Sequence, residues 1–244
     1  MKILALESSG LVASVAVTEG DNLLGEYTMN YKKTHSQTLL PMLQALTQMI
    51  ELDLNTIDAI AVSKGPGSFT GLRIGSATAK GLGLALDKPI IPVPTIDAMA
   101  YNLWGTDKLV CPLMDARRQQ TYTGLYTFEN GELRTVLPQC AVDISEIVGR
   151  INELGKAVIF LGDGVPVFEE YMKANLKVPY QLAPAGCNRQ SAASVAVLAE
   201  RLYQQGVVET AVEHKPDYLR LSQAERELAE RSSEGEEKGR DFRI

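Results

Sequence analysis

The sequence predicts an α/β protein of two similar lobes, because one order of elements occurs twice along its 244 residues. Each copy has the order strand, acidic turn, strand, turn, strand, helix, strand, helix, and the acids Glu7 and Asp115 occupy the same place in the two copies. Such self-similarity indicates a duplicated unit. A meander of three strands followed by strand–helix units is typical of ribonuclease-H-like lobes. Two such lobes form the architecture of actin, the sugar kinases and Hsp70, which is the fold class we expect.

The first copy, residues 1–105, begins with three short apolar or alternating runs, which favour strands. The turn sequences ESSG and EGDN separate them. The predicted elements are strands at 3–6, 11–18 and 23–29, a helix at 36–51, a strand at 57–63, a helix at 70–86 with Thr70 as its N-cap, a strand at 89–93 and a helix at 96–104.

The second copy, residues 106–220, has the same pattern and ends in a longer helix. Its predicted elements are strands at 109–114, 121–128 and 132–136, a helix at 144–154, a strand at 157–161, and helices at 167–174 and 188–205. Residues 221–244 are rich in Glu, Arg, Lys and Ser, so we expect them to form a charged, disordered tail.

Composition excludes several classes of protein. The net charge is −6, and no basic stripe is present, so we expect any contact with RNA to be shared with a basic partner. No run approaches the ~20 apolar residues that span a bilayer, and Glu7 comes too early for a signal peptide. Three widely spaced cysteines fit neither a disulfide framework nor a zinc site. We therefore expect a cytoplasmic protein with reduced thiols and no membrane contact.

A glycine-rich segment, residues 63–75, joins a predicted strand to a predicted helix. Its spacing matches neither the dinucleotide fingerprint nor the P-loop. A tight turn explains it, and so does an anion site at the helix N-terminus. Glu7 and Asp115 could hold magnesium or phosphate, or be structural turn acids. The candidate nucleotide or phosphate cleft consists of Glu7, Ser8, Ser9, Gly65, Gly67 and Asp115.

Two predicted helices have the composition of an interface. Between Lys33 and Glu51 there is no charged residue, and the apolar face is wider than one core contact needs. The next helix has small residues on one face, which would let another helix approach closely. A helix buried within its own domain is the alternative. The predicted partner or dimer interface consists of His35, Leu39, Leu40, Leu43, Leu46, Ile50, Gly71, Gly75, Thr78, Ala79, Leu82 and Leu86.

No convincing catalytic group follows from the sequence. A metal site at His35 would favour a second histidine one turn later, where Leu39 stands, so His35 is expected to be a polar residue at the helix start. A nucleophile needs an activating base, and the two histidines are far apart in the sequence. Two catalytic alternatives remain: a self-sufficient kinase or ATPase of the actin fold, and a cytoplasmic peptidase with Ser68 as its best candidate nucleophile.

Four motifs resemble the signature of the TsaB (YeaZ) family. They are GPGSFTGLRIG at 65–75, His35-Ser36 followed by Leu39-Leu40-Pro41, MDARR at 114–118 followed by Tyr122, and PDYLR at 216–220. The first motif is highly specific, and the match extends from residue 1 to about residue 220. The chain departs from the family in having Glu7-Ser8-Ser9 where Asp-Thr or Asp-Ser is usual, and QQTY at 119–122 where GEVY is common.

The resemblance implies a non-catalytic subunit in the synthesis of threonylcarbamoyladenosine at position 37 of ANN-decoding tRNAs. It implies pairing with TsaD, the metal-holding subunit that transfers the threonylcarbamoyl group, and assembly with TsaE, an ATPase. The first lobes pair through a helix bundle, and the same surface forms homodimers when the partner is absent. The complex uses ATP and magnesium, whereas this chain alone is expected to bind no cofactor or metal. Contact with tRNA is expected only through the complex.

Overall fold

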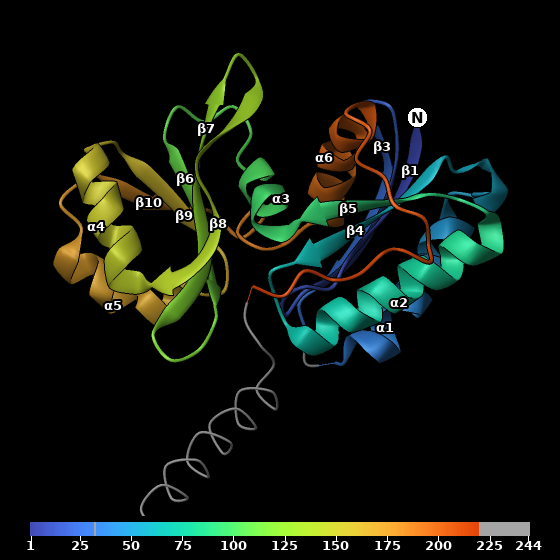
Figure 1. Cartoon of the computed structure of the whole chain (residues 1–244), viewed down its shortest axis with the longest axis horizontal. Coiled ribbons are helices and arrows are strands. Elements are labelled where there is room, and N and C mark those ends of the chain that lie inside the picture. Colours follow the sequence, from blue (N-terminus) through green and yellow to red (C-terminus); the bar gives the residue numbers. More distant parts are fainter. Residues whose placement is uncertain (32, 220–244) are drawn as a thin grey trace, which may run out of the picture.

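The computed structural model describes residues 1–31 and 33–219, and it contains two five-stranded mixed sheets (Figure 1). The first sheet has the strand order β3-β2-β1-β4-β5, and the second has the order β8-β7-β6-β9-β10. The second order repeats the first when β6 takes the place of β1. In both sheets three antiparallel strands are followed by two parallel ones. The predicted fold class of two ribonuclease-H-like lobes is confirmed.

The elements follow the predicted order closely. The first part of the chain forms β1 (Lys2–Glu7), β2 (Ala13–Glu19), β3 (Asn22–Met29), α1 (His35–Met49), a short 3-10 turn (Leu54–Thr56), β4 (Ala59–Gly65), α2 (Phe69–Leu86), β5 (Ile90–Pro94) and α3 (Thr95–Tyr101). The second part forms β6 (Leu109–Asp115), β7 (Gln120–Glu129), β8 (Glu132–Asp143), α4 (Ile144–Leu154), β9 (Val158–Leu161), α5 (Val165–Asn175), β10 (Tyr180–Leu182) and α6 (Ala192–Gln204).

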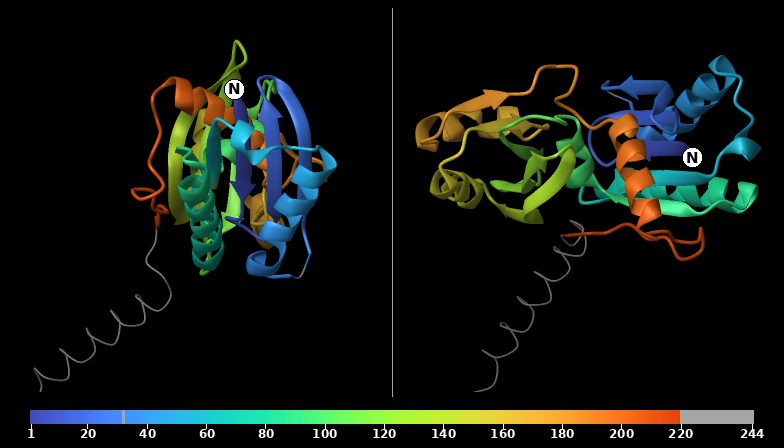
Figure 2. Two further views of the ribbon diagram at one scale, coloured as in Figure 1. Left: turned by 90° about the vertical axis from the view of Figure 1, so that its right-hand side faces the viewer. Right: turned by 90° about the horizontal axis from the view of Figure 1, so that it is seen from above.

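Each face of the first sheet is covered by two helices. Residues of β1 and β2 alternate between the faces, as the period of a strand requires. Leu4 and Leu6 pack with α1 and α2 on one face, whereas Ile3 and Ala5 pack with α3 and α6 on the other. Helix α3 lies between the two sheets (Figures 1 and 2). Helices α1 and α2 therefore share one face of the first lobe and touch each other there.

Three local details differ from the predictions. The N-cap of α2 is Ser68, whose side chain accepts a hydrogen bond from the Gly71 amide, so the helix begins one residue before the predicted cap Thr70. Strand β8 extends to Asp143, seven residues past its predicted end. The short strand β10 was not predicted, because Tyr180–Leu182 has too few residues to show a period.

The second lobe is shorter than residues 106–220. Helix α6 packs on the first sheet, where Ala192, Val195 and Ala199 are fully buried with β1 and β5. The chain then returns to β5, since Glu209 and Ile90 exchange backbone hydrogen bonds of 2.8 and 2.9 Å. The described residues from α6 to 219 therefore complete the first lobe. The predicted tail, residues 221–244, lies outside the described residues.

Hydrogen bonds join the two lobes. The Tyr126 hydroxyl of β7 donates to Asp97 of α3 at 2.6 Å, and both side chains are largely buried. The indole of Trp104, just after α3, donates to the carbonyl of Gly131 at the β7–β8 hairpin. Through these contacts α3 fixes the position of the second sheet relative to the first.

Candidate functional site

The acidic side chain in the turn between β1 and β2 is hydrogen-bonded by neighbouring serines of the first lobe. Glu7 ends β1 and is buried; one of its carboxylate oxygens accepts from the amide and the hydroxyl of Ser9, each at 2.6 Å. The other oxygen accepts from the Ser63 hydroxyl of β4. Burial raises the pKa of the Glu7 carboxyl, against the lowering effect of the hydrogen bonds from Ser63 and Ser9 and of nearby His35. The Glu7 carboxylate is thus held inside the protein, which leaves it little capacity for magnesium.

The glycines of the segment 65–75 accommodate this turn. A β-carbon at Gly67 or Gly71 would lie less than 3.0 Å from the backbone oxygens of Ser9 and Ser8, respectively. A β-carbon at Gly75 would meet the Ser8 hydroxyl equally closely. That hydroxyl donates to the Gly71 carbonyl at 2.9 Å. The strand-to-helix connection therefore approaches the chain's own β1–β2 turn, as the tight-turn interpretation requires.

Asp115, the counterpart of Glu7, makes its contacts in the second lobe. Its carboxylate accepts from the Arg117 amide at 2.8 Å and lies 3.4 Å from the Arg117 guanidinium. Asp163, at the start of α5, lies beside it. Burial raises the pKa of the Asp163 carboxyl, and the charge of Asp115 adds to this rise. One Asp163 oxygen is buried and accepts no hydrogen bond from the described residues. Asp115 therefore belongs to a separate acidic pair rather than to the Glu7 turn.

Part of the predicted interface lies inside the first lobe. On α1, Leu39, Leu43 and Leu46 are buried in the core between the helices and the sheet. On α2, Gly71, Gly75 and Ala79 are buried as well, because their face of the helix points to β1 and β4. These six residues are not available to a partner in this structure, so the small-residue face was assigned to the wrong contact. It serves the lobe's own packing.

The outward sides of α1 and α2 form a different surface. Leu40 and Met49 of α1 are 55% and 75% exposed, and Leu84 of α2 is 64% exposed. Gly81 has open space where a β-carbon would lie. Ile50, Thr78, Leu82 and Leu86 are half-buried at the border of this surface. We call the exposed apolar set the docking face, and it consists of Leu40, Ala77, Gly81 and Leu84. Met49 lies nine residues after Leu40 and so points to the opposite side of α1, whereas Arg73 and Lys80 share the Ala77 and Leu84 side of α2.

His35 links the first helix to the turn. It is the first residue of α1, as expected, and its Nε2 lies 2.8 Å from the carbonyl oxygen of Gly10. Its Nδ1 is buried and has no partner among the described residues. No group of three or more metal-ligating side chains occurs in residues 1–31 and 33–219. His35 therefore orients α1 against the β1–β2 turn.

Sequence reasoning missed the contacts of residues 209–218, which we call the strap. The motif PDYLR was noted, but nothing in the sequence shows what it touches. The Tyr218 ring lies 4.7 Å from the Phe69 ring at the start of α2, and Arg73 lies over the same Phe69 ring at 4.0 Å. The aromatic pair and the cation above it thus hold the Tyr218 end of the strap against the start of α2.

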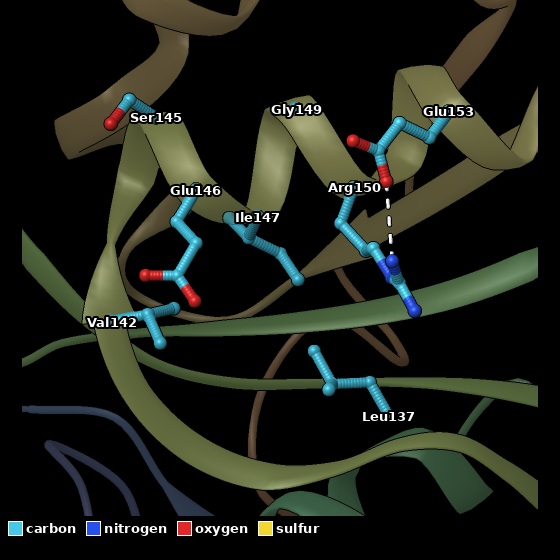
Figure 3. Close-up of a pocket in the computed structure, with 8 residues that line it drawn as sticks. All are labelled: Leu137, Val142, Ser145, Glu146, Ile147, Gly149, Arg150 and Glu153. Carbon is cyan, nitrogen blue, oxygen red and sulfur yellow. Dashed lines mark hydrogen bonds and ion pairs between the residues drawn. The ribbon is translucent and has the colours of Figure 1, made fainter.

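A groove of about 490 Å³ lies in the second lobe, between α4 and the end of β8 (Figure 3). Its rim carries the ion pair of Arg150 with Glu153, at 3.2 Å. The groove is lined by Leu137, Val142, Ser145, Glu146, Ile147, Gly149, Arg150 and Glu153. It contains none of the residues that the sequence indicated, so it is not part of the predicted site.

The geometry does not favour the peptidase alternative. The Ser68 hydroxyl caps α2, and the histidines lie elsewhere: His35 at Gly10 and His214 beside Glu209. A serine nucleophile would need one of them within hydrogen-bond reach.

No helix within the described residues is long and apolar enough to cross a bilayer. Together, the fold and the site define a two-lobed protein of the actin and sugar-kinase class, whose first turn is occupied by its own side chains and whose helical face is apolar with few charges.

Several known proteins are similar to this chain. A family model described as TsaD, tRNA N6-adenosine threonylcarbamoyltransferase, matches residues 22–228. The tRNA threonylcarbamoyladenosine biosynthesis protein TsaB of Bacillus subtilis is 34% identical over 227 residues, which cover 92% of this chain and 96% of that protein. TsaB of Escherichia coli is 29% identical over 236 residues, 93% and 98% of the two chains.

Solved structures agree. YeaZ from Pseudomonas aeruginosa superposes with a TM-score of 0.76 and 26% identity, over 89% of this chain and 99% of that one. A second structure from that organism, described as similar to peptidase YEAZ, has a TM-score of 0.74 and 26% identity, over 90% and 99%. The chain belongs to the TsaB (YeaZ) family, as the sequence motifs indicated.

Proposed function

We propose that this chain is a non-catalytic subunit in the synthesis of threonylcarbamoyladenosine on tRNA, where it pairs with a TsaD-type transferase subunit. The names of its TsaB relatives support the pathway. The proposed partner is related to this chain, because the TsaD family model matches 85% of it, residues 22–228. Pairing of related subunits through equivalent surfaces is a common way to build a symmetric or pseudo-symmetric dimer.

The docking face is the observation that carries this proposal. Leu40 and Leu84 expose large apolar side chains on two neighbouring helices. Helix α1 contains no charged residue, and α2 contains only Arg73 and Lys80. Apolar surface with little charge is typical of the core of a protein interface. The same face would form a homodimer when the partner is absent.

The non-catalytic role is supported by the contents of the first turn. Ser9 and Ser63 occupy both oxygens of Glu7, and Ser8 fills the space beside Gly71 and Gly75. The partner subunit would hold the metal, and a TsaE-type ATPase would use ATP and magnesium. Because the net charge is −6, the chain would contact tRNA only as part of the complex, in the cytoplasm.

An omission assay tests the proposal. Threonylcarbamoyl transfer to tRNA is measured with this chain, the TsaD-type and TsaE-type subunits and the adenylate-forming enzyme, and each protein is left out in turn. We expect no product when this chain is absent, and none when it is the only protein added. Full product without this chain would contradict the proposed function, and product from this chain alone would contradict the non-catalytic role.

A further inference from the structure

The strap, residues 209–218, follows α2 from one end of the helix to the other. Near the end of α2, a β-carbon at Gly83 would lie 3.0 Å from the β-carbon of Ala211, so the absence of a side chain there lets the strap approach the helix. Near the start of α2, the Tyr218 ring packs on Phe69. The strap is therefore a third element beside α1 and α2 on this face of the lobe.

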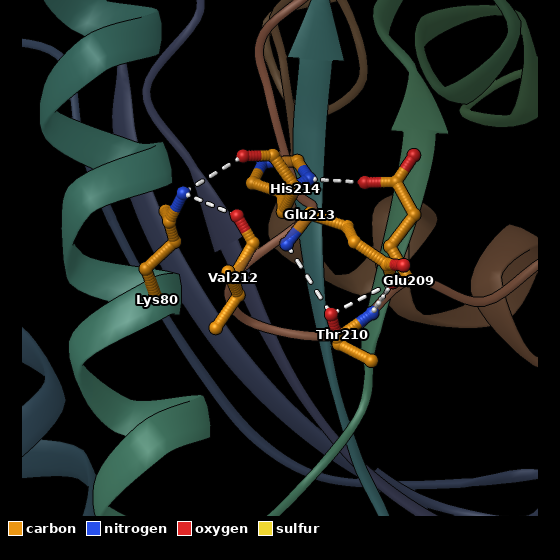
Figure 4. Close-up of polar contacts among 6 residues, drawn as sticks. All are labelled: Lys80, Glu209, Thr210, Val212, Glu213 and His214. Carbon is orange, nitrogen blue, oxygen red and sulfur yellow. Dashed lines mark hydrogen bonds and ion pairs between the residues drawn. The ribbon is translucent and has the colours of Figure 1, made fainter.

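Lys80 fixes the middle of the strap to α2 (Figure 4). Its ammonium group donates to the carbonyl oxygen of Val212 at 3.1 Å and to that of His214 at 3.0 Å. An ammonium group has three donors and no acceptor, so it can hold two carbonyls at once. Lys80 thus sets the distance between the strap and the helix.

The turn that contains Val212 is closed by its own polar contacts. The Glu213 carboxylate accepts from the Thr210 hydroxyl at 2.7 Å, and the Glu213 amide donates to that hydroxyl at 3.2 Å. His214 Nδ1 lies 2.7 Å from the Glu209 carboxylate, which joins the two ends of the turn (Figure 4). Val212 is therefore held in one backbone position.

Val212 is nevertheless 72% exposed, and it adjoins the docking face. Lys80 holds its carbonyl, and Leu84 lies one turn further along the same side of α2. Gly81, beside Leu84 on α2, leaves open space. A rigid backbone that presents an exposed apolar side chain does little for the isolated lobe, but it lowers the entropy cost of binding a partner.

We propose that the docking surface continues from α2 onto the strap, where Val212 contacts an apolar, uncharged surface of the partner subunit and Lys80 positions it. The occupant is the same TsaD-type subunit, so this inference rests on the proposed function. Continuity carries the argument, because Lys80, which holds the Val212 carbonyl, lies one turn before exposed Leu84 on the same side of α2. Glu213 is exposed and lies at the polar rim of this surface.

The test compares three substitutions that each introduce a carboxylate at an exposed apolar residue of the full chain. Val212→Asp alters the strap, Leu84→Asp alters the docking face, and Val167→Asp on α5 of the second lobe is the matched control. Binding to the TsaD-type subunit is measured by isothermal titration calorimetry. We expect Val212→Asp and Leu84→Asp to weaken binding about tenfold or more, as interface anchors do, and Val167→Asp to leave it unchanged.

The outcomes separate the two proposals. If Leu84→Asp weakens binding and Val212→Asp does not, the strap is not part of the interface, while the proposed function stands. If the unaltered chain does not bind the TsaD-type subunit, the proposed function fails and this inference fails with it. A loss of binding with Val167→Asp equal to that with Val212→Asp would show a general charge effect and overturn the assignment of Val212.

A second variant tests the positioning role of Lys80. Lys80→Met keeps an apolar stem but removes the donors to the two carbonyls. We expect faster amide hydrogen exchange at Glu209 and Asp217, together with weaker binding, and Lys80→Arg is expected to recover part of both. Faster exchange in the strap with unchanged binding would overturn the proposal, because the position of Val212 would then not matter.

Discussion

The carbonyl oxygen of Ser8 occupies the space that a β-carbon of Gly71 would need, and the Ser8 hydroxyl donates a hydrogen bond of 2.9 Å to the Gly71 carbonyl. A glycine inside a helix lowers helix stability by roughly 1 kcal/mol relative to alanine. Contact of α2 with the β1–β2 turn offsets this loss at Gly71 and Gly75. The glycines are therefore explained within one lobe, without a partner.

This contact predicts opposite effects for two glycines of the same helix. We expect Gly71→Ala to destabilise the fold by about 1–3 kcal/mol, because the Ser8 backbone must move. Gly81→Ala should stabilise it by up to about 1 kcal/mol, since the new methyl group enters open space. Urea denaturation of both variants measures the difference. Equal shifts in the two urea midpoints would show that helix propensity alone, without the Ser8 contact, determines the change in stability.

Substitutions on the two sides of α2 should separate binding from folding. We expect Leu84→Asp on α2 and Leu40→Asp on α1 to weaken binding to the TsaD-type subunit. Because both side chains are exposed, the unfolding midpoint should stay close to that of the unaltered chain. Ala79→Glu should lower the midpoint strongly, since it places an unpaired charge in the core. Leu182→Asp, exposed on β10, is the control. Folded Ala79→Glu protein of normal stability would contradict the assignment of faces.

Glu7 should make the free energy of unfolding depend on pH. Burial raises the pKa of the folded carboxyl above its ordinary value of 4.5, so the folded state holds a proton that the unfolded state releases. The contribution of protonated Glu7 to the free energy of unfolding is fully present below pH 4.5. It is lost as the pH rises through the pKa of the folded state. We expect Glu7→Gln to gain stability relative to the unaltered chain as the pH rises above 4.5. A difference in urea denaturation that stays constant as the pH rises would contradict the raised pKa.

His214 should give the strap the opposite dependence. Burial lowers the pKa of the His214 imidazole, although Glu209 acts to raise it; the charges of Lys80 and Lys64 lower it further. The stability that depends on neutral His214 is therefore present above its ordinary pKa of 6.5 and is lost as the pH falls toward the folded pKa. We expect the amide hydrogens of Ile90 and Glu209 to exchange faster below pH 6.5, after correction for the intrinsic rate, because the strap then separates more easily from β5. His214→Gln should remove this dependence, and an unchanged profile in that variant would rule out His214 as its source.

Most elements could be predicted from the sequence because their signals are local. The apolar period of β1 and β2 and the turn sequences after them depend on neighbouring residues. The equivalence of Glu7 and Asp115 could be predicted too, since a duplicated unit repeats its sequence pattern. Strand β10 and the strap could not, because Tyr180–Leu182 is too short for a period and the contacts of Val212 and Tyr218 are distant in sequence.

The sequence by itself determined the fold class, the family, an uncharged first helix and a second helix rich in small residues. Only the tertiary structure decided which side of each helix is free. Helix α2 has small residues on more than one side, and periodicity cannot show that Ser8 fills the side of Gly71 and Gly75 while Gly81 is left open. The path of the chain after α6 was likewise decided by packing, because α6 buries its apolar side against the first sheet rather than the second. Contacts between residues far apart in the chain fix both choices, and such contacts leave no local pattern in the sequence.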